Sequence, residues 1–412
     1  GEPFDGPVKD GGVIVATVSP GCWGAMITPD YPSGHEVTRP IAVEGARAGD
    51  AIALKIRKIR VLSLATTSGT DAPQEGHYVG DPFVAKRCPK CGLINPPTRV
   101  EGVGPDAVRC RKCGSAVHPF FFENTYTMLM DGERSVGVTV PPAVAAEIAE
   151  DAACFSALPP ASRQYSANLF ARGDLHGQIA PLRPMVGNVG TCPAVRMPAS
   201  HNAGDFGAFL VGAPHQYAIS EAELEERTDG HMDVNEVVEG SVVIAPVKVD
   251  GGGIYVGDVH AMMGDGEIAG HTTDVSAEVI IEVRVLKGLA LEGPIILPIS
   301  EDLPKIARPF TAEVLARARR TAAQYGFMLE DEALPVQVIG TGKDLNAAAA
   351  NGLARLSKLT GLPLPEVRNR CTITGQVEIG RLPGVVQVSM LTPKAILTRL
   401  QIWRLAQEQY QG

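Results

Sequence analysis

Short segments of alternating apolar and polar residues recur along this chain, and this period-two pattern predicts strands. The segments lie at residues 13–18, 41–50 (a strand and its turn), 51–59, 241–249, 254–260 and 273–287. Successive side chains of a strand point to opposite faces, so each of these segments can bury one face against a core. The turn Asp250–Gly253 lies between two of them. The pattern predicts a protein built mainly from sheets.

Helical spacing of apolar residues is confined to a few places. Pro141-Pro142 opens a predicted helix that carries Val144, Ile148 and Ala152. Ser220-Glu221-Ala222-Glu223 has the pattern of a capped, short acidic helix. The remaining predicted helices cover residues 311–325, 343–360 and 394–411. Two long stretches rich in Gly and Pro, residues 19–34 and 158–218, show little periodicity and are expected to be irregular; long irregular segments are often functional.

Composition agrees with this reading. Gly and Pro make up 77 of 412 residues and aromatic residues only 5%, which suits short strands joined by tight turns. We expect an α+β, β-rich fold: twisted sheets in a sandwich-like core, a few helices and long Gly/Pro loops. The net charge of −9 argues against general nucleic-acid binding, which needs a basic face. No apolar run reaches the ~18 residues that span a bilayer, so no membrane association is expected.

Four of the eight cysteines form two identical knuckles. They are Cys88-Pro-Lys-Cys91-Gly and Cys110-Arg-Lys-Cys113-Gly, separated by 18 residues. A two-residue gap lets both thiolates of a turn face one ion, and two such turns complete a tetrahedral zinc site. Four thiolates leave no open position, so we expect a structural zinc in a small inserted ribbon. Two disulfides or free thiols are the alternative reading of the same spacing.

The ribbon is basic on an acidic chain. Residues 86–113 hold seven Lys and Arg against two acidic residues. This charge suits an inserted folding module or an oligomer contact, or else the attraction of an acidic partner. The other four cysteines are isolated in sequence and are expected to be small buried hydrophobes. Free cysteines beside a thiolate site predict a reducing compartment, hence the cytoplasm.

Candidate chemistry concentrates in Gly257–Glu267. Asp258 and His260 lie at i and i+2 of a strand and are expected to share one face. A glycine-bounded turn carrying Asp265 and Glu267 follows at once. Imidazole and carboxylate ligands with flexible glycines are typical of an open metal site that keeps a position for water. A Gly-Asp turn with a surface histidine is the simpler alternative.

Further candidates repeat this residue chemistry elsewhere. His231 and Asp233 are again an i, i+2 pair, and His35 precedes a strand at the exit of a Gly/Pro loop. His271 and Asp274 form a weaker pair. Gly190-Thr191-Cys192 is expected to be a turn whose N–H groups can bind an oxyanion of the substrate, with buried packing as the alternative.

Several of these segments together resemble the acetamidase/formamidase family. The matching blocks, in the family's order, are Pro40–Ala46 with Gly49-Asp50, Gly190–Ala194, Gly230–Asp233 with Glu239-Gly240-Ser241, and Gly257–Glu267. His231 replaces the family's usual Asn and Met263 its usual Gln, the ribbon looks like an insertion, and the region after Lys287 fits only loosely. The resemblance implies a β-rich α+β fold, oligomers and hydrolysis of short aliphatic amides.

The resemblance suggests a division of the chain. Residues 1–80 would form an N-terminal β part of the amidase core, 81–120 the inserted ribbon, 121–300 the central core with the active site, and 301–412 a C-terminal α/β part.

Amide hydrolysis sets the expected roles. A divalent metal, expected to be zinc, can activate water and polarise the carbonyl. The expected ligands are His260, Asp258 and Asp233, with His35 or His231. Glu267 is expected to be the general base and then acid, and Asp265 to orient it or to join the ligands.

Two other readings stay open from the sequence. In one, Cys192 is the nucleophile of an amidase, which requires a lowered thiol pKa. In the other, the chain is a metal-binding protein without activity, and the ribbon recognises an acidic partner.

Overall fold

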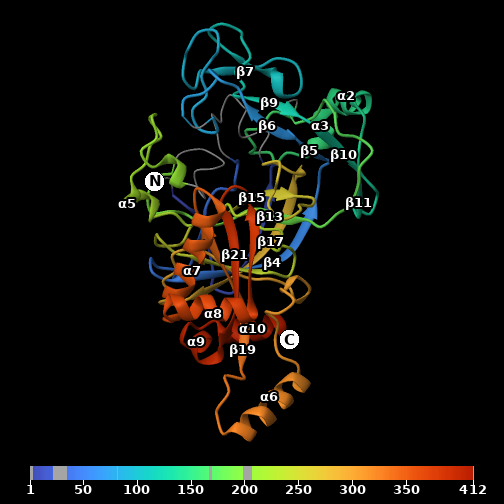
Figure 1. Ribbon diagram of the computed structural model, residues 1–412. Helices are drawn as coiled ribbons and strands as arrows, with labels where there is room; N and C mark the ends of the chain where they lie inside the picture. Colours follow the sequence, from blue (N-terminus) through green and yellow to red (C-terminus); the bar gives the residue numbers. More distant parts are fainter. Residues whose placement is uncertain (1–2, 22–34, 81, 167–168, 198–206, 412) are drawn as a thin grey trace.

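The computed structural model describes residues 3–21, 35–80, 82–166, 169–197 and 207–411 (Figure 1). The predicted Gly/Pro loop at 19–34 lies largely outside these residues. In the described part of the chain, two large sheets form the body. The first contains β1 (Asp5–Val8), β3 (Ile41–Val43), β5 (Ala65–Thr67), β10 (Tyr126–Met130), β11 (Val136–Thr139), β12 (Ile179–Pro181), β13 (Met185–Thr191), β15 (Ile254–His260) and β16 (Asp274–Val275). The second contains β2 (Val13–Val18), β4 (Ala51–Val61), β14 (Val242–Pro246), β17 (Ala277–Leu286), β18 (Ile295–Leu297), β19 (Ala333–Thr341), β20 (Gly375–Arg381) and β21 (Val385–Pro393).

Two further pairs of short strands and a set of helices complete the chain. The pairs are β6 (Thr70–Pro73) with β9 (Phe120–Glu123), and β7 (Thr98–Val100) with β8 (Val108–Cys110). The helices are α2 (Pro142–Glu150), α3 (Ala152–Ser156), α5 (Glu221–Leu224), α6 (Ala312–Tyr325), α7 (Leu345–Thr360), α8 (Leu364–Thr374), α9 (Lys394–Arg399) and α10 (Trp403–Tyr410). Single turns of 3₁₀ helix occur at Pro105–Ala107, Gly207–Leu210 and Ser300–Asp302. No helix among the described residues is both long and apolar enough to span a bilayer.

The main core lies between the two large sheets. In β2, Ile14, Ala16 and Val18 are buried while the intervening residues are exposed, as the alternation predicts. Residues of β2, β4 and β17 from one sheet form one apolar cluster with residues of β13 and β15 from the other. This confirms the β-rich, sandwich-like α+β fold expected from the sequence.

Helices cover the other face of the second sheet near the C-terminus. A second apolar cluster joins β18, β19 and β21 to α7, α8, α9 and α10. Helix α7 begins where the Asp344 side chain accepts from the Ala347 N–H at 2.8 Å, and it ends at Gly361 with φ of 71°. The strands β19–β21 thus extend the sheet that β2, β4 and β17 begin, so the last hundred residues share a sheet with the first sixty.

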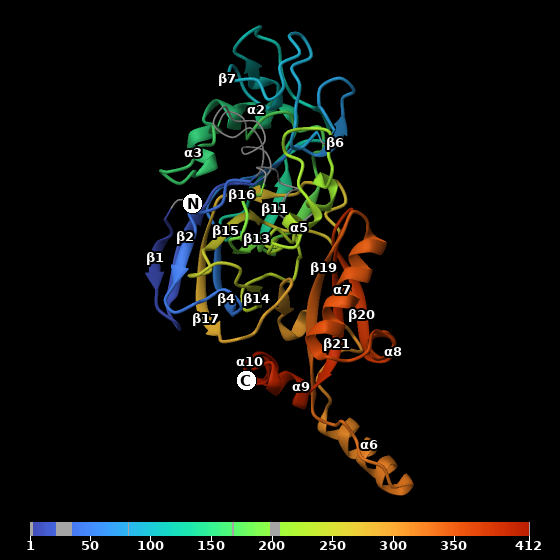
Figure 2. The same cartoon turned by 90° about the vertical axis from the view of Figure 1, so that its left-hand side faces the viewer.

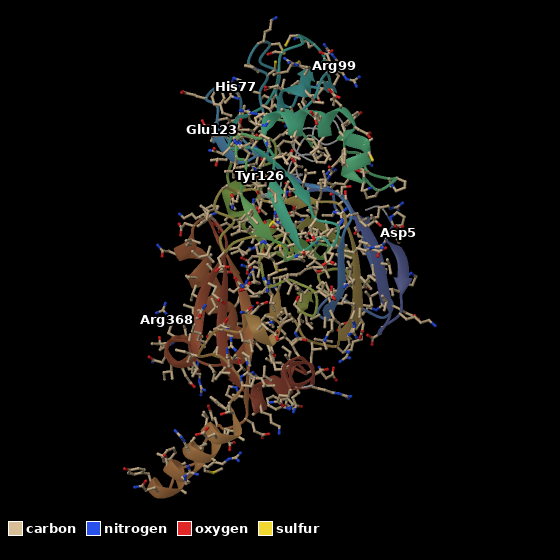
Figure 3. All side chains as sticks on the ribbon, turned by 90° about the vertical axis from the view of Figure 1, so that its right-hand side faces the viewer. Asp5, His77, Arg99, Glu123, Tyr126 and Arg368 are labelled. Carbon is tan, nitrogen blue, oxygen red and sulfur yellow. The ribbon has the colours of Figure 1, made fainter. Side chains whose placement is uncertain are left out.

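The two ends of the molecule are small projecting units. The ribbon around β7 lies at one end and α6 at the other (Figures 1 and 2). Arg99 of the ribbon is correspondingly remote from α6 in Figure 3. Beneath the ribbon, a third apolar cluster packs Cys88 and Cys110 with Phe120, Phe122 and Ile148.

Several expected elements differ from the observed ones. The segment 158–218 was expected to be irregular, yet β13 within it is a fully buried strand, because burial on both faces removes the alternation that marks a strand. The strand expected at 273–287 is two strands, β16 and β17. The helix expected at 394–411 breaks into α9 and α10, with Gln401 at φ of 61° between them.

Candidate active site

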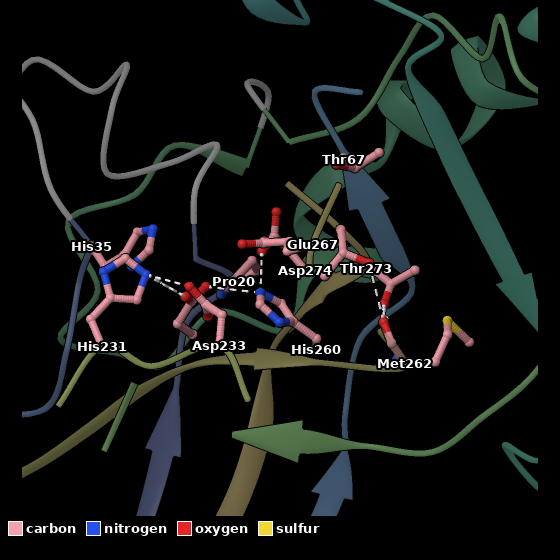
Figure 4. Close-up of polar contacts among 12 residues, drawn as sticks. Pro20, His35, Thr67, His231, Asp233, His260, Met262, Glu267, Thr273 and Asp274 are labelled. Carbon is pink, nitrogen blue, oxygen red and sulfur yellow. Dashed lines mark hydrogen bonds and ion pairs between the residues drawn. The ribbon is translucent and has the colours of Figure 1, made fainter. Parts of the chain in front are cut away.

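The candidate site is built around the end of β15, where Asp258 and His260 lie. Asp258 has φ of 53°, so the strand is irregular at that residue, and both side chains nevertheless reach one buried cluster. Neighbouring segments are held alongside by backbone pairing: Val37 pairs with Gly257, and Asn188 of β13 pairs with His231. The pairings bring His35 and His231 to the same end of β15 (Figure 4).

Glycines make room for this cluster. A Cβ on Gly187 would lie 2.3 Å from Asp233 Oδ1, and one on Gly21 would lie 1.7 Å from Asp258 Oδ1. Real side chains do not approach so closely, so these two positions require glycine for the carboxylates to pack against the backbone. The close backbone approach fixes where the carboxylates sit.

The glycine turn after β15 is held from the far end of the chain. Gly266 N–H donates to the Gly380 carbonyl at 3.2 Å, and Leu382 N–H donates to the Gly266 carbonyl at 2.9 Å. Arg381, between those two, reaches into the cluster: its Nε lies 3.0 Å from Glu267 Oε2 and its Nη1 lies 3.1 Å from Asp233 Oδ2. Strand β20, from the C-terminal part of the chain, therefore supplies one wall of the site.

The ligand-type atoms converge at short distances. Asp258 Oδ2 lies 3.2 Å from His35 Nδ1, and Asp258 Oδ1 lies 3.2 Å from His260 Nε2. His260 Nε2 is also 3.4 Å from Asp274 Oδ1. His231 Nε2 lies 2.8 Å from Asp233 Oδ2. Ligand atoms around a tetrahedral ion with bonds of 2.0–2.1 Å are about 3.3 Å apart, so this spacing fits a metal site.

Hydrogen bonding supports the same conclusion. The carboxylate oxygens of Asp258 and Asp274 and the ring nitrogens of His260 are buried, and none makes a well-aligned hydrogen bond within the described structure. Buried polar atoms are nearly always hydrogen-bonded, so a set of them facing a common point needs another partner. A divalent cation could bind His260 Nε2 together with one oxygen of each carboxylate, because imidazole nitrogen and carboxylate oxygen are its usual ligands.

Electrostatics favour positive charge at this place. Burial alone would raise the pKa of Asp258, but the imidazoles of His35 and His260 outweigh it and hold that pKa well below its usual range. Burial would lower the pKa of His260, but Asp258 and Asp274 raise it well above 6.5. Burial lowers the pKa of His35 to about 3, so its ring is neutral and can act as a ligand.

Glu267 is fully buried in the same cluster. Its burial, followed by the charge of Asp233, raises the pKa of the carboxyl to about 8, against the opposing effect of Arg381. A carboxyl group with a raised pKa, held by a guanidinium, has the environment of a group that exchanges protons near neutral pH.

The structure does not bring every expected residue into the cluster. Asp265 is exposed and accepts a hydrogen bond from Asn235 Nδ2, because the turn directs its side chain outward, so it neither contacts Glu267 nor joins the ligand atoms. Gly190 and Thr191 belong to β13 rather than to a turn, and they pair with Tyr255 and Ile254 of β15.

Cys192, which follows β13, has no oxyanion-binding turn around it. Its N–H donates to the carbonyls of Gly252 and Gly253 at 2.9 and 3.1 Å. Burial raises the pKa of the Cys192 thiol to about 11, the opposite of what a nucleophilic cysteine needs.

Sequence analysis ranked one member of the cluster, Asp274, too low and did not identify another, Arg381. Asp274, only a weak candidate, lies opposite His260 in the β15–β16 pairing. Arg381 lies in the C-terminal region, far beyond the last family block at Gly257–Glu267. Its only sequence signal is a charged residue in Gly380-Arg381-Leu382-Pro383-Gly384, between turn-forming residues at a strand end.

The four ribbon cysteines form a second metal-type cluster. Cys88 Sγ lies 3.4 Å from Cys113 Sγ, and Cys91 Sγ lies 3.8 Å from Cys110 Sγ. Sulfur atoms at Zn–S bonds of 2.3 Å are about 3.8 Å apart in a tetrahedron. Burial would raise the pKa of Cys110, but N–H groups of Cys113 and Lys112 lower it to about 7, which favours the thiolate. The four cysteines can hold a metal ion.

The sandwich buries imidazoles and carboxylates around one point, where they could hold a metal ion. The chain belongs to the Acetamidase/Formamidase family, whose model matches residues 22–227 and 222–399. This confirms the resemblance seen in the sequence and the enzyme class it implies, an amidase for non-peptide carbon–nitrogen bonds of linear amides. The family match also extends beyond Lys287, where the sequence blocks fitted loosely, and includes Arg381.

Individual relatives are distant. The chain is 34% identical to a putative formamidase of Schizosaccharomyces pombe over 74 residues, which are 17% of this chain and 18% of that protein. The alignment thus spans less than a fifth of that curated relative. Among solved structures, the acetamidase of Yersinia enterocolitica has 14% identity and a TM-score of 0.50, over 96% of this chain and 88% of that one. A predicted acetamidase/formamidase of Thermoanaerobacter tengcongensis has 19% identity and a TM-score of 0.49, over 96% and 91%.

Two carboxyl groups outside the cluster give a pH prediction. Burial, and then the charge of Glu378, raise the pKa of Glu236 from 4.5 to about 7. Between these pH values the folded protein keeps a proton that the unfolded chain has released, so stability falls as pH rises through this window. We expect Glu236→Gln to increase the free energy of unfolding by about 2 kcal/mol at pH 8 and by little at pH 4.

Urea unfolding at the two pH values measures this effect. Gln387 Nε2 donates a hydrogen bond to Glu236, and the side-chain oxygen of the Gln variant can still accept it. Glu147→Gln, an exposed change on α2, is the matched control and should show no pH-dependent difference. An equal effect of Glu236→Gln at both pH values would contradict the prediction.

Proposed function

We propose that this protein hydrolyses short linear amides of the formamide and acetamide type to a carboxylate and ammonia. The observation that carries the proposal is the convergence of His35, His231 and His260 with buried carboxylates at ligand-like distances, in a chain of this family. Such a site suits an unactivated amide, whose resonance demands both a strong nucleophile and polarisation of the carbonyl.

The residues fit a divalent ion, and we propose zinc. His260, Asp258 and Asp274 would hold it, or His260 with Asp233 and Glu267, since each set lies within 4.8 Å. A bound divalent ion supplies a nucleophilic water at neutral pH and polarises the substrate carbonyl.

The chain's own groups perform the proton transfers. Glu267 takes a proton from the attacking water at its carboxylate and returns it to the departing nitrogen, which requires a pKa near the working pH. Arg381 contacts both Glu267 and Asp233 and so fixes their orientation. Asp265, which faces solvent, has no place in this proposal.

The ribbon is proposed to carry a structural zinc, for which the four sulfur atoms within one cluster are the support. A homo-oligomer stays a prediction; the exposed Tyr325, Phe327 and Met328 at the end of the projecting α6 support it, and light scattering of the purified chain measures it. A cytoplasmic location and the absence of nucleic-acid and membrane partners also stay predictions.

An ammonia-release assay with a panel of short amides tests the proposed reaction. We expect turnover of formamide or acetamide by the metal-replete protein, loss after chelation, and recovery with a divalent ion. Alkylation by iodoacetamide should leave turnover intact, because burial raises the thiol pKa of Cys192. Absence of ammonia release from every amide with metal bound would refute the proposal and favour a binding protein; inactivation traced to Cys192 would favour the cysteine mechanism.

A further inference from the structure

A cavity of about 670 Å³ is lined by residues of α7, α9, β18 and β19 together with the loop 288–293. No residue of the candidate active site lines it. The ion pair of Lys358 with Glu292, both solvent-exposed, lies on its wall, so the cavity opens to solvent. A volume of this size is typical of sites that hold small organic molecules.

Arg355 of α7 presents a buried donor to this cavity. Its side chain is 6% exposed. Nη1 donates to the Ile339 carbonyl at 2.8 Å, and Nη2 lies 2.5 Å from Asp229 Oδ2, whereas Nε makes no hydrogen bond within the described structure. A Cβ on Gly293, which also lines the cavity, would lie 3.1 Å from Nε, so glycine leaves this face of the guanidinium open. Buried N–H groups are nearly always bonded, and Nε therefore needs an acceptor.

The buried charges beside the cavity are unequal. Arg227 and Arg355 are both buried and share the carboxylate of Asp229, with Arg227 Nε 3.0 Å from its Oδ1. Among the described residues, no second carboxylate pairs with either guanidinium. Two buried cations against one anion leave one positive charge without compensation, which is costly away from water. An anion bound at Arg355 would compensate it.

The charges on the rest of the wall limit the kind of anion. Lys248 and Arg399 meet backbone carbonyls rather than carboxylates within the described structure: Lys248 Nζ donates to Glu225 at 3.2 Å, and Arg399 Nη2 donates to Thr360 at 2.6 Å. Both cations can therefore also attract an anion. The carboxylates of Glu225 and Glu226 line the same cavity and would repel a highly charged ligand. The wall thus favours a single negative charge.

The remaining wall is apolar. Leu289, Leu291, Leu359 and Leu400 line the cavity. Covering apolar surface stabilises a complex by about 25 cal/mol per Å², and an ion as small as formate or acetate would leave these leucines uncovered. A hydrocarbon chain attached to the anionic group would cover them.

We propose that this cavity binds an aliphatic monocarboxylate longer than acetate, with its carboxylate at Arg355 Nε and its chain against the leucines. Guanidinium groups suit carboxylates because their N–H groups match the planar anion. The site is separate from the amidase chemistry and does not depend on it. Its ligand would contact the residue that holds Asp229, two positions before His231 in the candidate active site.

Calorimetric titration of the full, metal-replete chain tests the proposal with four probes: octanoate, acetate, inorganic phosphate and octan-1-ol. We expect octanoate to bind at least about tenfold more tightly than each of the other three, because it alone has both the charge and the chain. Absence of octanoate binding would overturn the proposal. Equal binding of octan-1-ol would remove the carboxylate from it, and equal binding of phosphate or acetate would remove the chain.

Two variants locate the bound octanoate. Leu359→Trp fills the cavity and Arg399→Gln removes a charge from its wall, and each should weaken octanoate binding by about tenfold or more. Arg355 is kept, because its loss would leave Asp229 buried with fewer partners and endanger the fold. Arg404→Gln, an exposed change on α10 outside the cavity, is the matched control and should bind octanoate normally.

Circular dichroism of each variant checks that it is folded. A folded Leu359→Trp protein that binds octanoate as tightly as the unaltered chain would overturn the proposal, since the ligand would then lie elsewhere, for example at a metal in the candidate active site. Ammonia release from amides, measured separately, decides the proposed function and has no bearing on this result.

Discussion

Glu267→Gln is expected to lower kcat for formamide or acetamide by about 10³-fold while leaving the metal content unchanged. The amide side chain has nearly the shape of the carboxylate but cannot accept a proton from water or return one to nitrogen. Since Arg381 lies 3.0 Å from Glu267 Oε2, the variant oxygen can keep that contact and the site its shape. Because the loss concerns proton transfer rather than binding, KM should change little.

Steady-state ammonia release and elemental analysis, taken together, check this prediction. Asp265→Asn is the matched control, because Asp265 lies two residues away on the same turn and is exposed. It should retain activity within about threefold of the unaltered protein, as is usual for surface changes away from the chemistry. A metal-loaded Glu267→Gln protein with near-normal turnover would remove Glu267 from the mechanism, and loss of metal would instead make it a ligand.

Cys110→Ser is expected to release one zinc per chain and to unfold the ribbon. Structural zinc sites contribute apparent binding free energies of about 10–16 kcal/mol in isolated zinc-finger peptides, so the ribbon should not stay folded without its ion. The effect should extend beneath it, because Cys88 and Cys110 pack with Phe120 and Ile148 in one apolar cluster. The main sandwich has its own core and should remain folded.

Zinc analysis and limited proteolysis test this expectation, with cleavage predicted within residues 81–120. Cys154→Ser removes an exposed thiol outside the cluster and should keep both the zinc and the protease resistance. If Cys110→Ser retains its zinc and resists the protease as well as Cys154→Ser does, the four cysteines are not a structural metal site. Amide turnover measured in parallel shows whether the ribbon supports the active site.

The sequence by itself determined the elements with a strong local pattern. The alternation in Val13–Val18 matched β2 residue for residue, and Ser220-x-x-Glu223 formed the capping box that begins α5. The two Cys-x-x-Cys knuckles met in one cluster, as their spacing predicted. Six candidate site residues also lie together in one cluster, because loops and strand ends of one sheet converge there. They are His35, His231, Asp233, Asp258, His260 and Glu267.

Only the tertiary structure decided the rest, because it depends on contacts between distant parts of the chain. Strand β13 is buried on both faces and so has no alternating pattern to detect. Asp265 and Glu267 look equivalent in sequence, and only the docking of the turn on β20 buries one and exposes the other. Arg381 enters the cluster from more than a hundred residues away. The tertiary structure also decided that one oxygen of Asp258 lies near His35 and the other near His260.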